Sequence, residues 1–445
     1  MSSSPVVPSP VRGSGASLLA RILGEIGLPA RGVTRDGGRH VPLPSRLATG
    51  ELAWTCVAAA QIAAGRTPDT IDPHRVAVAY RSDRYLEIDG TAPPVWSPYS
   101  GFWRTDDGWI RTHGNYPHHA AALLRGLRLA SDADADAVRL AIERRTQADV
   151  LSAVTAAGGL AVPVQTERPV EDRALRDTPV LDIVRFPAPV RPPRRIPEDQ
   201  PHLPLRGLRV LDLTRVIAGP VCTRTLALLG ADVLRIDPPH LREPEWQHLD
   251  TGQGKRSAVL DARVSRIHEL LGEADAVVLG YRPAALARLG LDPDDLALRY
   301  PGMVIAQLSA WGAEHHHRAG FDSLVQAESG IALIESRDAE TPGVLPAQAL
   351  DHSAGYLLAA AVTALVRRRA VEGGTWRVRT SLRRVAAELL GMARVREPEP
   401  ETAFDPRPHL ARFVVDGHEL VTSKPALSGF DFAAPRPWGR DQPVW

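Results

Sequence analysis

The spacing of apolar residues in the second half of the chain predicts alternating strands and helices. LRVLDL (208–213) predicts an apolar strand, the next apolar positions form a helix that ends at Gly230, and ADVLRIDPP (231–239) supplies a second strand. A strand, a helix and a further strand in this order form a parallel unit. We therefore expect an α/β fold with a doubly wound, mainly parallel, Rossmann-like sheet, and a smaller α/β domain beside it.

Residues 97–166 predict that smaller domain. Asp106, Asp107 and Gly108 are a hairpin turn signal between two aromatic strands. A helix is expected around 118–127, further helices lie within 132–157, and GGLAVPVQT (158–166) predicts a closing strand.

An Ala-rich helix is predicted over residues 50–64 and another over 355–366. Each is followed at nearly the same spacing by a stretch that predicts a strand, 75–80 in the first case and 376–382 in the second. The earlier segment therefore resembles the later one in its order of predicted elements.

Composition divides the chain into five segments. Residues 1–44 begin with a stretch rich in Ser, Pro and Gly, which we expect to be disordered, and continue with a short helix. Residues 45–185 hold the first Ala-rich helix and the small-domain elements. The stretch 186–204 is a linker, because its prolines exclude helix and sheet interiors. Residues 205–385 form the doubly wound domain, and the pattern leaves the tail 386–445 unassigned.

Charge and cysteine content narrow the class of protein. Lys plus Arg number 53 and Asp plus Glu 52, so the formal net charge of +1 gives no overall attraction to nucleic acid or a membrane surface. Cys56 and Cys222 are the only cysteines, which argues against a disulfide framework or a cysteine-based zinc site. The first residues lack a charged segment followed by an apolar core. We expect a cytoplasmic protein with no nucleic-acid or membrane partner.

Asp322 lies where a glycine-containing loop becomes a helix, within AGFDSLVQAESG (319–330). Asp is a favoured N-cap residue, so the local sequence by itself indicates a plain helix cap. The same position also suits a nucleophilic carboxylate. A helix N-terminus helps to keep it ionised and offers N–H groups to a developing oxyanion.

GQGKRS (252–257) puts Lys255 and Arg256 beside flexible glycines just before a strand. Such cations can hold phosphate oxygens by charge-assisted hydrogen bonds, and the plain alternative is a solvated turn. No G-x-G-x-x-G follows the strand 208–213, which disfavours a dinucleotide site. Ligands of doubly wound sheets bind outside the carboxyl ends of strands, so the loop after 208–213 is a further binding candidate.

Several motifs occur in one order and spacing between residues 204 and 330. They are PLRGLRVLDLTRVIAGPVCTRTLALLGADVLRIDPP, LDTGQGKRSAVLDAR, ADAVVLGYRPAALARLG and AGFDSLVQAESG. In these motifs the chain resembles the family III CoA-transferases, the group that includes formyl-CoA and carnitine CoA-transferases and a branch of acyl-CoA racemases. The resemblance implies an enzyme that moves CoA between an acyl-CoA thioester and a carboxylic acid, with Asp322 as the nucleophile of an aspartyl covalent intermediate. It also implies coenzyme A as the bound group, no metal, and a homodimer.

The resemblance also assigns CoA-binding residues. Lys255 and Arg256 match the segment that contacts the nucleotide end of CoA, and Tyr281 offers a flat face for the adenine. Gly280 and Leu279 depart from the family pattern, which commonly has Asn and Glu there. The implied CoA-binding residues are Val216, Ala218, Gly219, Pro220, Lys255, Arg256, Tyr281 and Arg288.

Histidines gather in two places. His315, His316 and His317 are adjacent, and adjacent ligands cannot readily converge on one ion from a regular backbone, so we expect a solvated loop. One of them is also a candidate acid–base partner of Asp322. The second group lies in the predicted small domain, as surface residues or as the lining of an acyl pocket: His113, Tyr116, His118 and His119.

Residues 45–80 resemble a remnant of the family's late large-domain helix and strand, and residues 98–185 resemble the small domain that follows it in the family. The order of segments therefore departs from that of the family, because small-domain sequence precedes large-domain sequence. A circular permutation and a fused tandem copy that has lost its first half both fit this order. The glycine-rich loop that shields the intermediate in transferases is not evident between Tyr80 and Tyr99. Two other functions therefore stay open: an acyl-CoA racemase or epimerase, which needs a second proton-transfer residue opposite Asp322, and a non-catalytic CoA-binding descendant.

Overall fold

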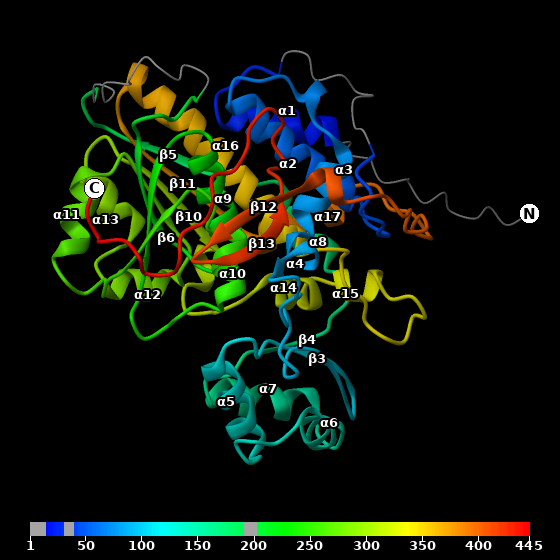
Figure 1. The fold of residues 1–445 in the computed structure, drawn as a ribbon. Helices are drawn as coiled ribbons and strands as arrows, with labels where there is room; N and C mark the ends of the chain where they lie inside the picture. Colours follow the sequence, from blue (N-terminus) through cyan, green and yellow to red (C-terminus); the bar gives the residue numbers. More distant parts are fainter. Residues whose placement is uncertain (1–14, 31–39, 191–202) are drawn as a thin grey trace, which may run out of the picture.

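The computed structural model describes residues 15–30, 40–190 and 203–445, and its centre is a seven-stranded sheet (Figure 1). The strand order is β5-β11-β10-β9-β6-β7-β8, with β5 antiparallel at one edge and the other strands parallel. The predicted mainly parallel sheet is confirmed. The strands are β5 (Asp182–Phe186), β6 (Arg209–Leu213), β7 (Asp232–Asp237), β8 (Arg256–Val259), β9 (Ala276–Leu279), β10 (Val304–Ser309) and β11 (Thr375–Ser381).

Successive side chains along the strands enter two different cores, as the alternation of a strand requires. Val210 and Val278 pack on one face with the long helices, whereas Leu211 and Val277 pack on the other face with shorter ones. Helices therefore cover both faces, which makes the sheet doubly wound. They are α9 (Ala218–Leu228), α10 (Glu245–Thr251), α11 (Arg266–Glu273), α12 (Pro283–Arg288), α13 (Pro293–Arg299), α14 (Asp322–Glu328), α15 (Ile331–Ile334), α16 (Ala349–Glu372) and α17 (Leu382–Gly391).

Helix α16 is the central helix of the fold. Within the described ranges it alone is long and apolar enough to cross a membrane, but its apolar stretch is wholly buried inside the protein. It packs against α9, against α17 and along α2 (Thr49–Ala63). The two predicted Ala-rich helices therefore pack on each other, because small side chains let helix backbones approach closely.

The strand predicted over 75–80 is wrong, because these residues form the helix α3 (Pro73–Tyr80). Asp72 caps that helix, with its Oδ1 accepting a hydrogen bond from His74 N at 2.9 Å, and Pro73 occupies the first helical position. Val76 through Tyr80 are all buried, so their apparent strand pattern reflects burial on every side. Helices α1 (Gly15–Glu25) and α4 (Ser82–Tyr85) complete this part.

The predicted small domain forms a separate lobe below the large sheet in Figure 1. Its antiparallel sheet has the order β2-β3-β4, and its own apolar core includes Ile110 and Val154. It packs on the large domain through β3, β4 and helix α14, where Gln165 N donates to Ala327 O at 3.1 Å. Its elements are β2 (Phe102–Thr105), β3 (Gly108–Thr112), α5 (Pro117–Leu127), α6 (Ala135–Glu143), α7 (Gln147–Ala156) and β4 (Ala161–Pro163).

The flanking segments differ in part from the prediction. Residues 182–186, expected with the small domain, form β5 at the edge of the large sheet, after helix α8 (Pro169–Arg176). In the tail, β12 (Leu410–Val415) and β13 (His418–Ser423) form a small sheet with β1 (Glu87–Ile88), and Trp445 Nε1 donates to Leu270 O at 2.9 Å. The predicted disordered stretch falls mainly on residues 1–14 and most of the linker on 191–202, outside the described residues.

Gly355 tests the close approach of α16 to α9. A Cβ atom there would lie 2.6 Å from Ala218 O and 2.8 Å from Val221 Cβ. We expect Gly355→Ala to lower the free energy of unfolding by about 1–3 kcal/mol, because the helices must separate. The control Gly272→Ala, in a helix with open space around the added methyl group, should raise it by roughly 0.5–1 kcal/mol. Equal effects in a denaturant titration would contradict this packing.

Candidate active site

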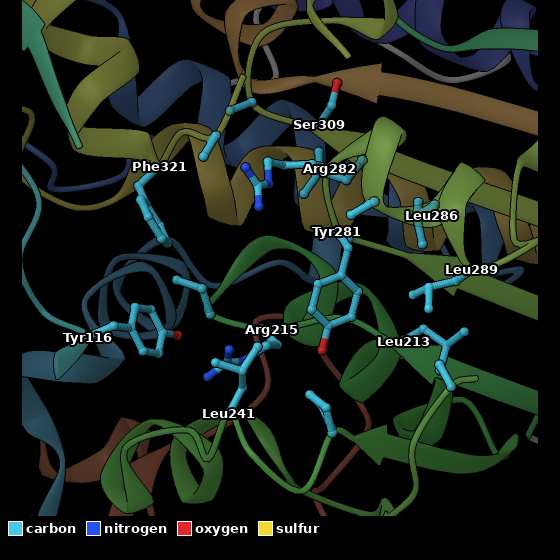
Figure 2. Close-up of a pocket in the computed structure, with 18 of the residues that line it drawn as sticks. Tyr116, Leu213, Arg215, Leu241, Tyr281, Arg282, Leu286, Leu289, Ser309 and Phe321 are labelled. Carbon is cyan, nitrogen blue, oxygen red and sulfur yellow. The ribbon is translucent and has the colours of Figure 1, made fainter. Parts of the chain in front are cut away.

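A cavity of about 610 Å³ opens at the carboxyl ends of the parallel strands (Figure 2). Leu213 ends β6, Ser309 ends β10 and Tyr281 lies just beyond β9, and all line this cavity. Tyr116 and Leu160 line it from the small lobe. The cavity therefore lies where doubly wound sheets bind their ligands, at the junction of the two domains.

Arginines supply the positive charge of the large cavity. Figure 2 shows Arg215 and Arg282 extending into the lined space from different loops, and Arg263 belongs to the same lining. Arg215 Cζ lies 4.7 Å from the centre of the Tyr116 ring. Burial, followed by the neighbouring His118, lowers the pKa of His119 to about 4, so this histidine adds no charge at neutral pH.

The loop after β6 forms a strained wall of the large cavity. Val216 has φ +74°, which is unusual for a β-branched residue, and its N–H donates to Glu243 Oε1 at 2.7 Å. Glu243 also accepts a hydrogen bond from Tyr116 Oη at 3.1 Å and forms an ion pair with the buried Arg235. These contacts offset the strain and hold the loop in place. Val216 and Ala218 face the cavity, whereas Gly219 packs too closely on Thr214 to accept a Cβ atom.

Of the two predicted CoA-binding residues that follow β9, one lines the large cavity and the other does not. Tyr281 lines the large cavity, and its hydroxyl group is buried with no hydrogen-bond partner in the described part of the chain. Burial raises the pKa of that hydroxyl. Arg288 is exposed at the end of α12 and does not line the cavity, whereas Arg282, adjacent to Tyr281, does.

Lys255 and Arg256 do not line the cavity, in contrast to their predicted phosphate contacts. Lys255 is only 2% exposed, and its Nζ donates to Asp212 Oδ2 and Pro220 O, both at 3.0 Å. Arg256 binds both carboxylate oxygens of Asp232, at 2.9 and 2.8 Å. In this structure the charge of Lys255 is therefore used inside the protein, where it joins β6 to the first turn of α9, which contains Pro220.

Asp322 is the first residue of α14, but it does not cap that helix. The position before the helix is occupied by Phe321, and no side-chain cap is present there. The Asp322 carboxylate instead accepts hydrogen bonds from Gln326 Nε2 at 2.5 Å and from the backbone N of Asp351, in the first turn of α16, at 2.9 Å. The prediction of a plain cap is wrong, because the carboxylate joins the N-termini of two helices.

The pKa of Asp322 is raised to about 6 by burial, against the opposing effect of its hydrogen bonds with Gln326 and the start of α16. The more distant positive charge of Arg111 also opposes this rise. At neutral pH most of the Asp322 population is therefore ionised, and an ionised carboxylate can act as a nucleophile.

A second cavity of about 40 Å³ touches Asp322 itself. His113 and Trp96 line it from the small-lobe side, and Tyr116, Phe321 and Asp351 line both this cavity and the large one. The rings of Phe321 and His113 are stacked, with centres 3.7 Å apart and an angle of 6° between planes. Phe321 of this pair lines both cavities, whereas His113 lines only the small one. Burial lowers the pKa of His113 to about 3, so its ring is neutral.

The predicted histidine groups therefore behave differently. His315, His316 and His317 are exposed and line neither cavity, so none of them contacts Asp322. The small-lobe residues His113, Tyr116, His118 and His119 line one cavity or both.

Sequence reasoning did not find Arg215, Arg282, Glu243 or Asp351. Arg282 could have been found from its position beside Tyr281. Glu243 and Asp351 gave no local signal, because each acts on a segment distant in sequence.

Comparisons with known proteins bear on the family of this chain. The model of CoA-transferase family III matches residues 205–409. The probable fatty acyl-CoA transferase Rv3272 of Mycobacterium tuberculosis is 32% identical over 265 residues, which covers 51% of this chain and 67% of that protein. Mouse succinyl-CoA:glutarate CoA-transferase is 32% identical over 162 residues, 32% of this chain and 37% of the relative. The chain thus spans only about a third of that second protein.

A crystal structure of Rv3272 from Mycobacterium tuberculosis also resembles part of this chain. It is 33% identical, covers 42% of this chain and 56% of the other, and has a TM-score of 0.39. That score is too low to bear on the fold.

The buried Lys255 is best tested by stability. We expect Lys255→Met to lower the free energy of unfolding by about 3–5 kcal/mol, because Asp212 would be left as an uncompensated buried charge. The control Arg256→Ala removes a neighbouring but partly exposed ion pair and should cost about 1 kcal/mol or less. Urea titrations of both variants measure the difference. A Lys255→Met protein of normal stability would contradict the internal role.

Proposed function

Because the chain belongs to CoA-transferase family III, we propose that it moves coenzyme A between an acyl-CoA thioester and a carboxylic acid, with Asp322 as the nucleophile. The observation that carries this proposal is the buried Asp322 carboxylate, held by the Gln326 side chain and by the N-terminus of α16 beside a small cavity that adjoins a much larger one. The large cavity would hold the nucleotide and pantetheine parts of CoA, and the small cavity would hold the reacting carbonyl group.

The residues of the large cavity suit a nucleotide thioester. Arg215 and Arg282 offer charged donors to phosphate oxygens, and Tyr281 offers an aromatic face to the adenine. The apolar side chains between them, including Leu286 and Leu289, would cover the adenine and the pantetheine arm. Lys255 has no place in this assignment, because its ammonium group is buried elsewhere.

The reaction proceeds through covalent steps on Asp322. An Asp322 oxygen attacks the thioester carbonyl carbon, the C–S bond breaks, and the CoA thiolate leaves behind a mixed anhydride. The thiolate then attacks Cγ of Asp322 and releases the donor acid, which gives an aspartyl-CoA thioester. The acceptor carboxylate repeats these steps in reverse order and leaves as its CoA thioester, so no net proton is consumed.

The identity of the acids is left to experiment. The relatives are named for fatty acyl, acetyl, and succinyl and glutarate substrates, which share only the acyl-CoA and carboxylate chemistry. The homodimer implied by the family remains a prediction, and so does a cytoplasmic location. The described lining of both cavities comes from one chain.

Asp322→Asn tests the nucleophile. We expect this variant to lose transfer by about 10⁴-fold or more, because an amide cannot form the anhydride, while CoA binding is retained. Wild-type protein incubated with an acyl-CoA should yield a hydroxamate at Asp322 after hydroxylamine treatment, as measured by peptide mass spectrometry.

Glu328→Gln, on the same helix but outside both cavities, is the matched control and should keep its activity. A wild-type enzyme that turns over without labelling Asp322, together with an active Asp322→Asn variant, would remove the covalent mechanism. If the wild type binds CoA but shows no transfer with any acyl-CoA tested, the result would favour a non-catalytic CoA-binding function.

Arg282→Ala and Arg215→Ala test the location of the phosphates. Each should weaken CoA binding by about 1.5–3 kcal/mol per lost charged hydrogen bond, as measured by calorimetry. Arg288→Ala, an exposed change on the same short segment, should have little effect because Arg288 lies outside the cavity. If Arg288→Ala weakens binding more than Arg282→Ala, the phosphates do not lie in this cavity.

A further inference from the structure

We propose that Asp351 is a second catalytic residue of this site, whose carboxylic acid donates a hydrogen bond to the acyl oxygen while Asp322 attacks the carbonyl carbon. The inference rests on the proposed function and adds to it the group that receives the developing oxyanion.

Asp351 lies at the junction of the two cavities. It belongs to the first turn of α16, is 6% exposed, and lines both the large cavity and the small one. Its backbone N holds Asp322 Oδ2 at 2.9 Å, so the two residues are in direct contact. Asp351 therefore adjoins the route by which a thioester whose CoA occupies the large cavity would reach Asp322.

The hydrogen bonds of the two carboxyl groups are unequal. Asp322 accepts two hydrogen bonds, from Gln326 Nε2 and from Asp351 N, and these favour its ionised form. No hydrogen bond to the Asp351 carboxyl group is found in the described ranges. When two neighbouring buried carboxyl groups share one negative charge, the group that accepts hydrogen bonds is the one that ionises. Asp322 is therefore the ionised group and Asp351 keeps its proton.

The surroundings of Asp351 keep that proton in place. The titratable groups that face the small cavity with it are Asp83, His113, Tyr116 and Asp322, and Arg111 acts on Asp322 from β3. Burial raises the pKa of Asp83 to about 6, and His113 and Tyr116 are neutral near pH 7. Burial, and then the charge of Asp322, raise the pKa of Asp351 well above its ordinary value. Among the described residues no cation lines the small cavity, and the charges that shift the pKa of Asp351 do not include the arginines of the large cavity, Arg215, Arg263 and Arg282.

A neutral carboxylic acid can act as an oxyanion donor in a buried site. When an Asp322 oxygen bonds to the carbonyl carbon, the electron pair of the C=O bond moves to the oxygen, which accepts the hydrogen bond from Asp351. When that pair returns, the C–S bond breaks and CoA leaves as a thiolate. Asp351 keeps its proton throughout, so the step balances without a further acid or base.

The test compares Asp351→Leu with Asp351→Asn. The backbone N–H that holds Asp322 is unchanged in both variants, and Asn retains a hydrogen-bond donor. With acetyl-CoA, succinyl-CoA or hexadecanoyl-CoA, whichever labels Asp322 in the wild type, Asp351→Leu should lower kcat by about 10²–10³-fold with little change in KM. Asp351→Asn should restore kcat to within roughly tenfold of the wild type, since it keeps a donor.

The pH profile separates this role from a structural one. Wild-type kcat should rise as Asp322 ionises, near pH 6, and fall at higher pH as Asp351 loses its proton. Asp351→Asn should keep the rise and lose the fall. If Asp351 only stabilised the first turn of α16, both variants would have altered melting temperatures but unaltered kcat and pH profiles. That result would overturn the proposal.

Two further outcomes are distinct. If the wild type incorporates deuterium from D₂O at the α-carbon of the acyl group and Asp351→Asn does not, Asp351 removes a proton and the hydrogen-bond role is wrong. If no acyl-CoA labels Asp322 in the wild type, the proposed function fails and this inference fails with it. Labelling at the wild-type rate in Asp351→Leu overturns the inference alone.

Discussion

The burial of α16 is the constraint on which the active site depends. The helix lies between α2, α9 and the large sheet, so its first turn cannot shift without disturbing the main core. That turn supplies the backbone N–H that holds Asp322 and also carries Asp351. The position of the Asp322 carboxylate is thereby tied to the packing of this 24-residue helix, as well as to α14, the helix that Asp322 begins.

A cluster of buried ion pairs positions another part of the cavity wall, the loop after β6. Arg235 is paired with Asp237 and Glu243, and Glu243 in turn holds the strained backbone of Val216. A further buried pair, Lys255 with Asp212, holds the start of α9 through Pro220. Charges of this kind are costly to bury, so they are kept where they fix a geometry that apolar contacts cannot specify. Here they fix a loop that lines both cavities.

Sequence periodicity predicted the parallel sheet, and the motif around Asp322 predicted a carboxylate at the start of a helix, where the structure has it. Periodicity failed at 75–80, where Asp72 and Pro73 start a helix whose apolar positions are buried on every side. The prediction that Lys255 binds phosphate was also wrong for this structure. A lysine beside glycines has the same local sequence whether its ammonium group faces a ligand or pairs with a buried carboxylate such as Asp212. Asp351 and Glu243 could not be predicted, because their partners are distant along the chain.

The resemblance between the Ala-rich helices has a structural counterpart in the packing of α2 along α16. This packing is compatible both with a permuted chain and with a truncated tandem copy, since either would bring related helices together.

The small cavity is built from residues 83–116 on one side and 216–351 on the other. Contacts between such distant segments carry a high entropic cost of loop closure, so they form late and slowly during folding. On a ribosome, the wall that contains Trp96 and His113 emerges long before α16 has been synthesised. Asp322 therefore acquires its enclosure, and with it the raised pKa, only once these segments have met, and a partly folded chain would hold an ordinary, solvated aspartate with no protected site beside it.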